Sequence, residues 1–435
     1  MRVARRHWRE RDHARLLPVL GVWLILSVCV ALLAAAASAA FMAMLTWATD
    51  LREHSPWWLL GLPPAGFAMV WIYQRYGLGA EKGNNLLLDE IHDPRHPVPL
   101  RMVPLVLVST LLTHLVGGSA GREGTAVQMG GALADWLART GRVSRETRRQ
   151  LLVAGMAAGF AALFGTPLAA AVFALEVLAI GRIQYDTLLP VFLSAVLAAR
   201  FATLMGIAHS HYSVGIVPDP ELAGLLTALA LGAAAGIAAW GFSRAMHGTA
   251  RAARRWIPHA PSRAAAGGLL IAVLIPLTGA WRYAGLGLPV IADAFRVPLP
   301  WYDPLAKLGL TALTLGSGFK GGEVTPLFFI GASLGNVLAP LGALPMPLMA
   351  GVGMVAVFAG AANTPLAGAL MAMELFGAPA GGYAAVACVM SYCFAGHSGI
   401  YLAQRIAQGK FMAVLPGTRL GDERALWRAR LRSRK

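Results

Sequence analysis

The sequence GGSAGREGTAV, residues 117–127, places Arg122 and Glu123 side by side among four glycines, directly after an apolar run. A charged pair beside a membrane-spanning segment is costly and indicates a functional site. Glycine-rich backbone at membrane depth survives only where it is buried or lines an aqueous cavity. A helix that starts after such a break directs free N–H groups and its positive dipole end into that cavity, which favours an anion. This stretch therefore predicts a membrane fold of broken helices with an anion site at the break.

The composition of the whole chain agrees with a membrane location. Of 435 residues, 57% are hydrophobic and 13% are charged, whereas soluble proteins carry about 25% charged residues. Several apolar stretches have the length that crosses a bilayer. They lie at Leu16–Ala48, Met102–Val116, Leu151–Ile180, Leu188–Gly206, Leu222–Trp240, Ala264–Leu277, Pro347–Leu375 and Tyr383–Ala395. We expect an all-α polytopic membrane protein, because the repeated alternations of a membrane β-barrel are absent from the sequence.

The net charge of +16 is concentrated in short segments beside the apolar stretches. These segments are 2–11, 139–149, 244–263 and 424–435. Basic segments next to membrane spans mark the cytoplasmic side, so we expect no nucleic-acid partner. We expect one membrane domain over 1–435, with basic cytoplasmic termini at 1–16 and 407–435 and an even number of crossings. We therefore expect a multi-pass protein located in the cell (inner) membrane.

The N-terminus starts as a secretory signal does, with a basic segment, an apolar run and the small-residue string AAAASAA at 34–40. The apolar run continues to Ala48, which is longer than the apolar region of a signal. We therefore expect an uncleaved first helix.

Metal and cofactor motifs are missing from the sequence. His209 and His211 have a ligand spacing, but no third ligand is nearby, so a loop is the favoured interpretation. Three cysteines lie in apolar segments without disulfide or metal-binding spacing, at Cys29, Cys388 and Cys393. We expect no metal and no cofactor.

An internal repeat relates the two halves of the chain. GTPLAAAVFALEV at 165–177 reappears as NTPLAGALMAMEL at 363–375, an offset of 198 residues. A glycine-rich motif with a glutamate precedes each copy, and Glu123 and Glu323 of these motifs are 200 residues apart. Duplicated halves are typical of transporters, in which the two copies often have inverted topology.

Inverted copies would bring their glycine-rich breaks from opposite faces toward the midplane of the membrane. We expect two inverted-topology half-repeats, 17–206 and 222–405, whose broken helices meet there. The breaks are GAEKGNNLLL at 79–88, GGSAGREGTAV at 117–127, GSGFKGGEVTPLF at 316–328 and GHSGIYLAQRI at 396–406. An α-solenoid is not favoured, because it needs three or more short repeats.

These motifs resemble the CLC family of chloride channels and proton-coupled anion antiporters. Gly121-Arg122-Glu123-Gly124 is similar to the family's gating-glutamate motif, and residues 322–326, Gly-Glu-Val-Thr-Pro, to its Gly-x-x-x-Pro motif. Tyr401 lies where the family has a central-site tyrosine. The likeness runs in order from about Gly79 to Gln404. It implies a homodimer in the lipid bilayer, with one pathway in each subunit.

Four departures from the family pattern narrow the resemblance. Residues 83–87 are Gly-Asn-Asn-Leu-Leu where the family usually has Gly-Ser-Gly-Ile-Pro, and Thr125 replaces a proline. Glu323 occupies a position that is normally apolar, and Val177 replaces the inner glutamate of many antiporters. These features are similar to the fluoride-exporting branch, which implies export of fluoride in exchange for protons. A chloride-selective channel or a chloride/proton antiporter of the same family is the alternative.

Two glutamates are the candidate carriers of this exchange. As a carboxylate, Glu123 would occupy the anion site, and once protonated it would release the site to fluoride. Both forms are accessible because burial favours the protonated form, whereas amide donors favour the ionised form. Its alternative role is a structural ion pair with Arg122. Glu323 is the second acidic site and a candidate proton acceptor, whose alternative role is an ion pair with Lys320.

Fluoride holds its water tightly, so a selective site must replace those hydrogen bonds. The candidate anion-binding residues are Gly83, Asn84, Asn85, Val324, Thr325 and Tyr401. We expect Asn84 to face the anion. The alternatives are that the asparagine pair caps a helix beginning at Leu86 and that Tyr401 is a tyrosine of the membrane interface.

An enzymatic function is not favoured by the sequence. An intramembrane enzyme would need paired aspartates or a Ser/His pair on facing helices, and we find no nucleophile–base pair, phosphate loop or dinucleotide fingerprint. Glu176 and Glu374 occupy equivalent repeat positions, so we expect matching structural contacts in both halves. The Gly155–Gly159 spacing is typical of close helix packing.

Overall fold

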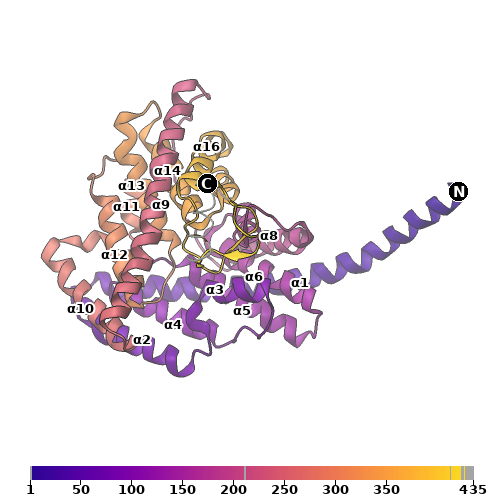
Figure 1. Ribbon diagram of the computed structural model, residues 1–435, viewed down its shortest axis with the longest axis horizontal. Helices are drawn as coiled ribbons and strands as arrows, with labels where there is room; N and C mark the ends of the chain where they lie inside the picture. Colours follow the sequence, from indigo (N-terminus) through magenta and orange to yellow (C-terminus); the bar gives the residue numbers. More distant parts are fainter. Residues whose placement is uncertain (1, 210–211, 412, 423–425, 427–435) are drawn as a thin grey trace.

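The computed structural model describes residues 2–209, 212–411, 413–422 and 426, with residues 2–16 described by their backbone alone. His211 and most of the basic C-terminal segment lie outside the described residues. The described chain is built almost entirely from helices, as the sequence predicts (Figure 1).

Sixteen α-helices occur in the described part of the chain. The first half contains α1 (Arg2–Glu53), α2 (Leu62–Tyr76), α3 (Asn84–His92), α4 (Met102–Leu115), α5 (Glu123–Thr140), α6 (Arg145–Phe164), α7 (Pro167–Glu176) and α8 (Leu188–Leu204). The second half contains α9 (Leu222–Trp256), α10 (Ala260–Thr278), α11 (Leu288–Asp293), α12 (Asp303–Ser317), α13 (Val324–Leu338), α14 (Met346–Ala362), α15 (Pro365–Phe376) and α16 (Gly381–Phe394).

Short elements complete the chain. The 3-10 turns are η1 (Pro56–Gly61), η2 (Ala80–Lys82), η3 (Tyr185–Thr187), η4 (Ala280–Tyr283), η5 (Ala339–Leu341) and η6 (Ala378–Ala380). In the part of the chain that the structure describes, three two-residue strands form one small sheet in the order β1 (Ala179–Ile180), β2 (Arg405–Ile406) and β3 (Thr418–Arg419). β2 runs parallel to β1 and antiparallel to β3, so the segment after the last helix returns to the connection between α7 and α8.

Among the described residues, five helical segments are long and apolar enough to cross a membrane. They are Leu17–Glu53, Tyr185–Leu204, Leu222–Trp256, Ala260–Thr278 and Val324–Leu341. The apolar stretches 151–180 and 347–375 each divide into two helices, which sequence periodicity alone did not separate. The breaks fall at left-handed residues, Gly165 with φ 75° and Asn363 with φ 59°, each followed by a proline that opens the next helix.

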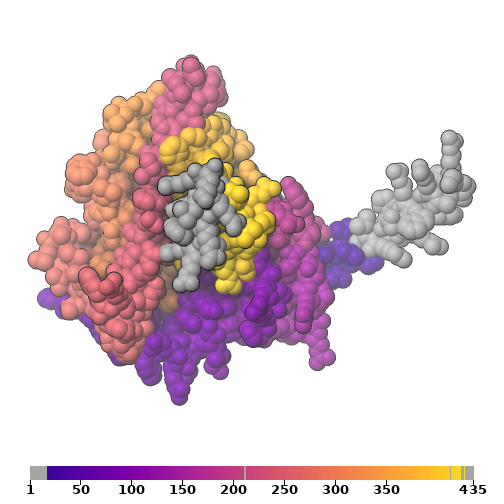
Figure 2. Space-filling view, in the orientation of Figure 1, coloured from indigo at the N-terminus to yellow at the C-terminus, as the bar shows by residue number. Residues whose placement is uncertain are grey.

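The repeat is visible in the order of the elements. α4 to α8 in the first half correspond to α12 to α16 in the second. Most of the first half, coloured indigo to magenta, lies in the lower part of the view, and most of the second half, coloured pink through orange to yellow, lies above it (Figures 1 and 2). Close glycine contacts recur in both halves. A Cβ on Gly130 of α5 would lie 2.2 Å from the Gly155 carbonyl oxygen of α6, and one on Gly331 of α13 would lie 2.2 Å from that of Gly353 of α14. Close packing at Gly155 is therefore confirmed, with its counterpart in the second half.

Glu176 and Glu374 make the matching contacts that their repeat positions predict. The Glu176 carboxylate ends α7 and accepts the backbone N–H groups of Leu366 and Ala367, at 3.1 and 3.0 Å, in the first turn of α15. The Glu374 carboxylate lies near the end of α15 and accepts the N–H groups at the start of α7, at 2.9 and 2.8 Å. Each half thus caps a helix of the other half with a carboxylate, where the helix dipole favours negative charge.

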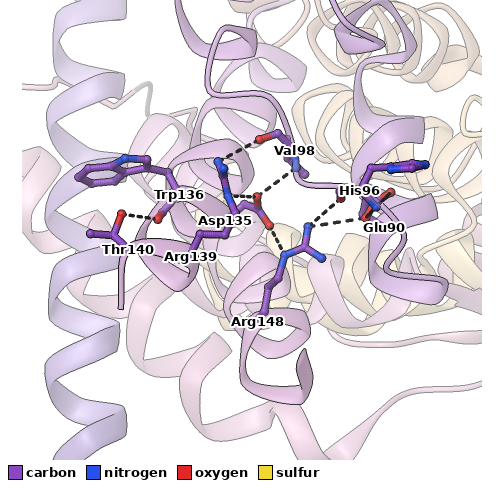
Figure 3. A network of polar contacts seen from close by, with 8 residues as sticks. All are labelled: Glu90, His96, Val98, Asp135, Trp136, Arg139, Thr140 and Arg148. Atoms are coloured by element: carbon purple, nitrogen blue, oxygen red, sulfur yellow. Dashed lines mark hydrogen bonds and ion pairs between the residues drawn. The ribbon is translucent and has the colours of Figure 1, made fainter. Parts of the chain in front are cut away.

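A polar network fixes the segment between α3 and α4 (Figure 3). Asp135 of α5 is fully buried and accepts the Val98 N–H at 3.0 Å and the Arg148 Nε–H at 2.5 Å. Arg148 of α6 also lies 3.6 Å from the Glu90 carboxylate of α3 and donates to the His96 carbonyl oxygen at 3.0 Å. The network joins α3, α5 and α6, so the helix that begins at the first glycine-rich break is held against the helix that begins at the second.

Candidate functional site

The second and third glycine-rich breaks meet in the structure. Gly121 and Gly322 exchange two backbone hydrogen bonds, at 2.6 and 2.7 Å, as an isolated antiparallel bridge. α5 begins two residues later at Glu123, and α13 begins two residues later at Val324. The structural counterpart of Glu123 is therefore Val324. The repeat in the sequence instead paired Glu123 with Glu323, which is one position away. Glu323 corresponds to Arg122.

The Glu123 carboxylate crosses from its own helix to the start of α13. The side chain is 1% exposed and accepts the Thr325 hydroxyl, with distances of 2.6 Å to Oε1 and 2.7 Å to Oε2. It also accepts the backbone N–H of Thr325 at 3.1 Å and that of Arg122 at 3.2 Å. A carboxylate therefore lies at a helix N-terminus among amide and hydroxyl donors, which is an anion site by its chemistry.

The ion pair between Arg122 and Glu123 exists but is longer than these hydrogen bonds. The Arg122 Nε atom lies 3.8 Å from Glu123 Oε1, and within the described structure this Nε has no hydrogen-bond acceptor. The donors from Thr325 are thus the closer partners of the carboxylate.

The two asparagines have different surroundings. The Asn85 side-chain oxygen accepts the Ala403 N–H at 2.8 Å and holds the segment that carries the fourth break. Asn84 is 7% exposed, and its side-chain oxygen has no hydrogen-bond donor among the residues that the structure describes. A Cβ on Gly124 would lie 3.3 Å from Asn84 Nδ2 and 3.6 Å from Glu323 Oε2, so an amide and a carboxylate converge there.

The capping alternative for the asparagine pair is wrong. α3 begins at Asn84, not Leu86, and its cap is Gly83 with φ 58° and no side-chain cap hydrogen bond. Positive φ is a conformation that glycine adopts without strain. Gly83 therefore turns the chain so that α3 starts at the break.

Lys320 and Glu323 lie on the segment that joins α12 to α13. The Lys320 ammonium donates to the Glu81 carbonyl oxygen at 2.9 Å and lies 4.8 Å from the centre of the Tyr73 ring. Between these two described residues no direct ion pair forms, so the ion-pair alternative for Glu323 does not hold in this conformation.

Tyr401 lies inside the protein and not at a membrane interface. Its side chain is 3% exposed, belongs to the main hydrophobic core and meets the Phe173 ring edge-on at 6.4 Å. The backbone beside it is fixed on two sides, by the Ile400 N–H to the Ala361 carbonyl at 3.0 Å and by the bond between Ala403 and Asn85. The interface alternative for this tyrosine is therefore wrong.

Two polar side chains near the site were not anticipated. Gln128 of α5 is 8% exposed, and a Cβ on Gly83 would lie 3.2 Å from its Nε2 atom. Thr110 of α4 shares a 2.7 Å hydrogen bond with the Thr125 hydroxyl in the first turn of α5. For Gln128 the available signal was a polar residue little more than one turn after Glu123 on the same helix.

A small cavity adjoins the Glu123 carboxylate. It has a volume of about 20 Å³, and its lining includes Arg122, Glu123, Thr325, Tyr212 and Phe328. A cavity of this size holds about one water-sized particle. His209 lies elsewhere, and its Nε2 is 3.1 Å from the Ala162 carbonyl oxygen. Among the described residues, no group of three potential metal ligands includes it.

The chain is similar to several known proteins. The model of the voltage gated chloride channel family matches residues 65–396. A chloride/fluoride channel protein of Pseudomonas syringae pv. tomato is 50% identical over 415 residues, which cover 94% of this chain and 92% of that protein. A putative chloride channel protein, ClcB-like, of Ralstonia nicotianae is 34% identical over 74% of this chain and 78% of its own length.

Solved structures give the same result at the level of the fold. The crystal structure of a CLC-type fluoride/proton antiporter superposes with a TM-score of 0.86 at 38% identity and covers 89% of this chain and 98% of that one. The structure of a slow cyanobacterial Cl-/H+ antiporter has a TM-score of 0.73 at 22% identity, over 86% of this chain and 94% of that one.

Proposed function

This chain belongs to the voltage gated chloride channel family, and on that premise we propose that it is a membrane antiporter that exports fluoride in exchange for protons. The observation that carries the proposal is the Glu123 carboxylate, held at the start of α13 by the Thr325 hydroxyl and amide. The names of the 50% identical relative and of the most similar solved structure cited above support fluoride as the anion.

The gate works by competition between two anions for one set of donors. The ionised Glu123 carboxylate takes the Thr325 O–H and N–H, so the site is closed to fluoride. A proton on the carboxylate removes its charge, and charge-assisted hydrogen bonds of this kind are worth about 1.5–3 kcal/mol each. The protonated side chain therefore leaves, and fluoride takes the same donors. One proton then moves with each exchange of occupants.

Selectivity for fluoride comes from strong donors in a tight space. The Asn84 amide, with two N–H donors, replaces the single hydroxyl of the serine that the family usually has, and it converges with Glu323 on Gly124. The space beside Glu123 has room for about one water-sized particle, which suits fluoride better than the larger chloride. Gly83, Asn85, Val324 and Tyr401 lie outside the lining of this cavity, and we propose that they contribute to the anion path on the side of Asn84.

Glu323 is the second proton-carrying group in this proposal. Its carboxylate oxygen lies near Gly124, in the first turn of the helix that bears Glu123. Two carboxylates close together repel each other when both are charged, so a proton on one of them removes this repulsion. Val177 occupies the position of the inner glutamate in the family's other antiporters, and Glu323 takes over the acceptor role.

The test is simultaneous recording of fluoride and pH in proteoliposomes. Glu123→Gln should retain fluoride movement and lose fluoride-driven proton movement, because a glutamine cannot carry the proton. Undiminished proton movement in this variant would refute the gating role. The same vesicles loaded with chloride decide between fluoride/proton exchange and the chloride alternative, since a chloride-selective protein would move chloride at least as fast as fluoride.

We further propose a homodimer in the inner membrane with both termini on the cytoplasmic side. The basic segments 139–149 and 244–263 fall at the α5–α6 and α9–α10 junctions, which the positive-inside rule assigns to the cytoplasm. Light scattering in detergent measures the mass of the assembly, and terminal reporter fusions give the orientation. A monomer or an external C-terminus would contradict these assignments.

A further inference from the structure

A second cavity lies apart from the Glu123 site. It has a volume of about 770 Å³ and lies between the end of α2, the turn η2, the α9–α10 junction and the segment before α13. Its charged side chains are four cations and one carboxylate, Arg75, Arg254, Arg263, Lys320 and Glu81. The exchange steps above use none of them.

The positive charge of this cavity is only partly compensated. Arg263 donates to the Ile257 carbonyl oxygen at 3.2 Å, and Lys320 donates to the Glu81 carbonyl oxygen at 2.9 Å. A carbonyl dipole orients a cation without cancelling its charge, so the carboxylate of Glu81 is the opposing charge in the lining. A cleft lined by one sign of charge with low-dielectric walls focuses its field and raises the local concentration of counter-ions.

Lys320 connects the cavity with the site. It lies three residues before Glu323, on a segment that Gly318 turns with φ 117°. Its counterpart in the first half, by the 201-residue offset of the bridged glycines, is Ser119. That side chain is fully buried and bonds to the Thr311 hydroxyl at 2.9 Å. The second half therefore carries an ammonium group beside a cavity at the position where the first half carries a buried hydroxyl.

We propose that this cavity is a basic antechamber, which gathers small inorganic anions from the cytoplasm, with Lys320 as the last cation before the Glu323–Gly124 region. The cytoplasmic assignment follows from the basic α9–α10 junction. That fluoride is the anion gathered rests on the proposed function, whereas the accumulation of anions rests on the lining charges alone.

Cysteine labelling tests the accumulation directly. Gln74 of α2 is exposed and lines the cavity, and Gln74→Cys in a background with the three native cysteines replaced by alanine gives a single reactive thiol. In inside-out vesicles, we expect an anionic methanethiosulfonate to modify it about 10-fold faster than a cationic reagent of similar size. The ratio should fall toward one as salt shortens the screening length.

A matched pair of variants shows which charges are responsible. Arg254→Gln removes a lining cation and should lower the ratio several-fold, whereas Arg255→Gln removes its neighbour in the chain, which is outside the lining, and should leave it unchanged. A ratio near one in the starting protein, or an equal fall in both variants, would overturn the proposal.

Transport gives the second readout. Lys320→Met should raise the KM for cytoplasmic fluoride several-fold and leave the maximal rate nearly unchanged, because the variant lowers the local fluoride concentration without altering the Glu123 site. An unchanged KM would overturn the role of Lys320. Since labelling needs no transport, an intact labelling ratio together with failed fluoride exchange would refute the proposed function and not the antechamber.

Discussion

Thr325→Val is the most informative substitution at the site, because valine keeps the shape of threonine and removes only the hydroxyl. That hydroxyl donates to Glu123 at 2.6 Å from Oε1, and both residues are 2% exposed or less. A hydrogen bond to a charged group contributes about 1.5–3 kcal/mol. The carboxylate-occupied state therefore loses about 10- to 150-fold in its population relative to the displaced side chain. The backbone amides of Thr325 and Arg122 still donate to the Glu123 carboxylate in this variant, so the carboxylate is bound more weakly but is still bound.

Paired recordings of fluoride and proton flux measure this effect. In Thr325→Val the unprotonated gate should leave the site more often, so fluoride passes without a proton and the number of protons moved per fluoride falls. Thr325→Ser keeps the hydroxyl and is the matched control, in which coupling should persist. The flux ratio is independent of the amount of active protein. An unchanged ratio in the valine variant would show that the hydroxyl does not hold the gate and would refute the competition mechanism.

Three further variants test other parts of the structure. Asn84→Ser should weaken discrimination between fluoride and chloride by about fivefold, the value of one amide donor, and an unchanged flux ratio would count against that role. Arg148→Gln should lower the melting temperature by several degrees, because it removes a partner of the buried Asp135, a loss of about 3–5 kcal/mol. Arg139→Gln is its control, since that side chain is 41% exposed and an exposed pair contributes about 1 kcal/mol or less; equal shifts would contradict the assignment. Glu374→Gln should also lower the melting temperature, because an amide oxygen replaces a carboxylate that caps α7, and an unchanged value would show that the cap contributes nothing.

The sequence by itself determined the features that depend on local pattern. Apolar length predicted the membrane helices, and glycine-rich breaks beside charged residues predicted where helices start, as Glu123 at the beginning of α5 confirms. The repeat predicted matching roles for Glu176 and Glu374, because equivalent positions in duplicated halves have equivalent surroundings. Composition alone did not distinguish one long helix from two short ones at α6–α7 and α14–α15. A left-handed residue followed by a proline divides the helices at both places.

Only the tertiary structure decided which groups meet. The Glu123 carboxylate binds Thr325, 202 residues away, and the one-residue shift of the repeat at Gly121 and Gly322 makes Val324 its counterpart. The sequence favoured Asn84 over Asn85 as the residue that faces the anion, and only the structure shows that the Asn85 side chain accepts the Ala403 N–H instead. The physical reason is that hydrophobic periodicity fixes each helix and its buried face, whereas hydrogen bonds between halves depend on how two packed bodies bring their helix ends together.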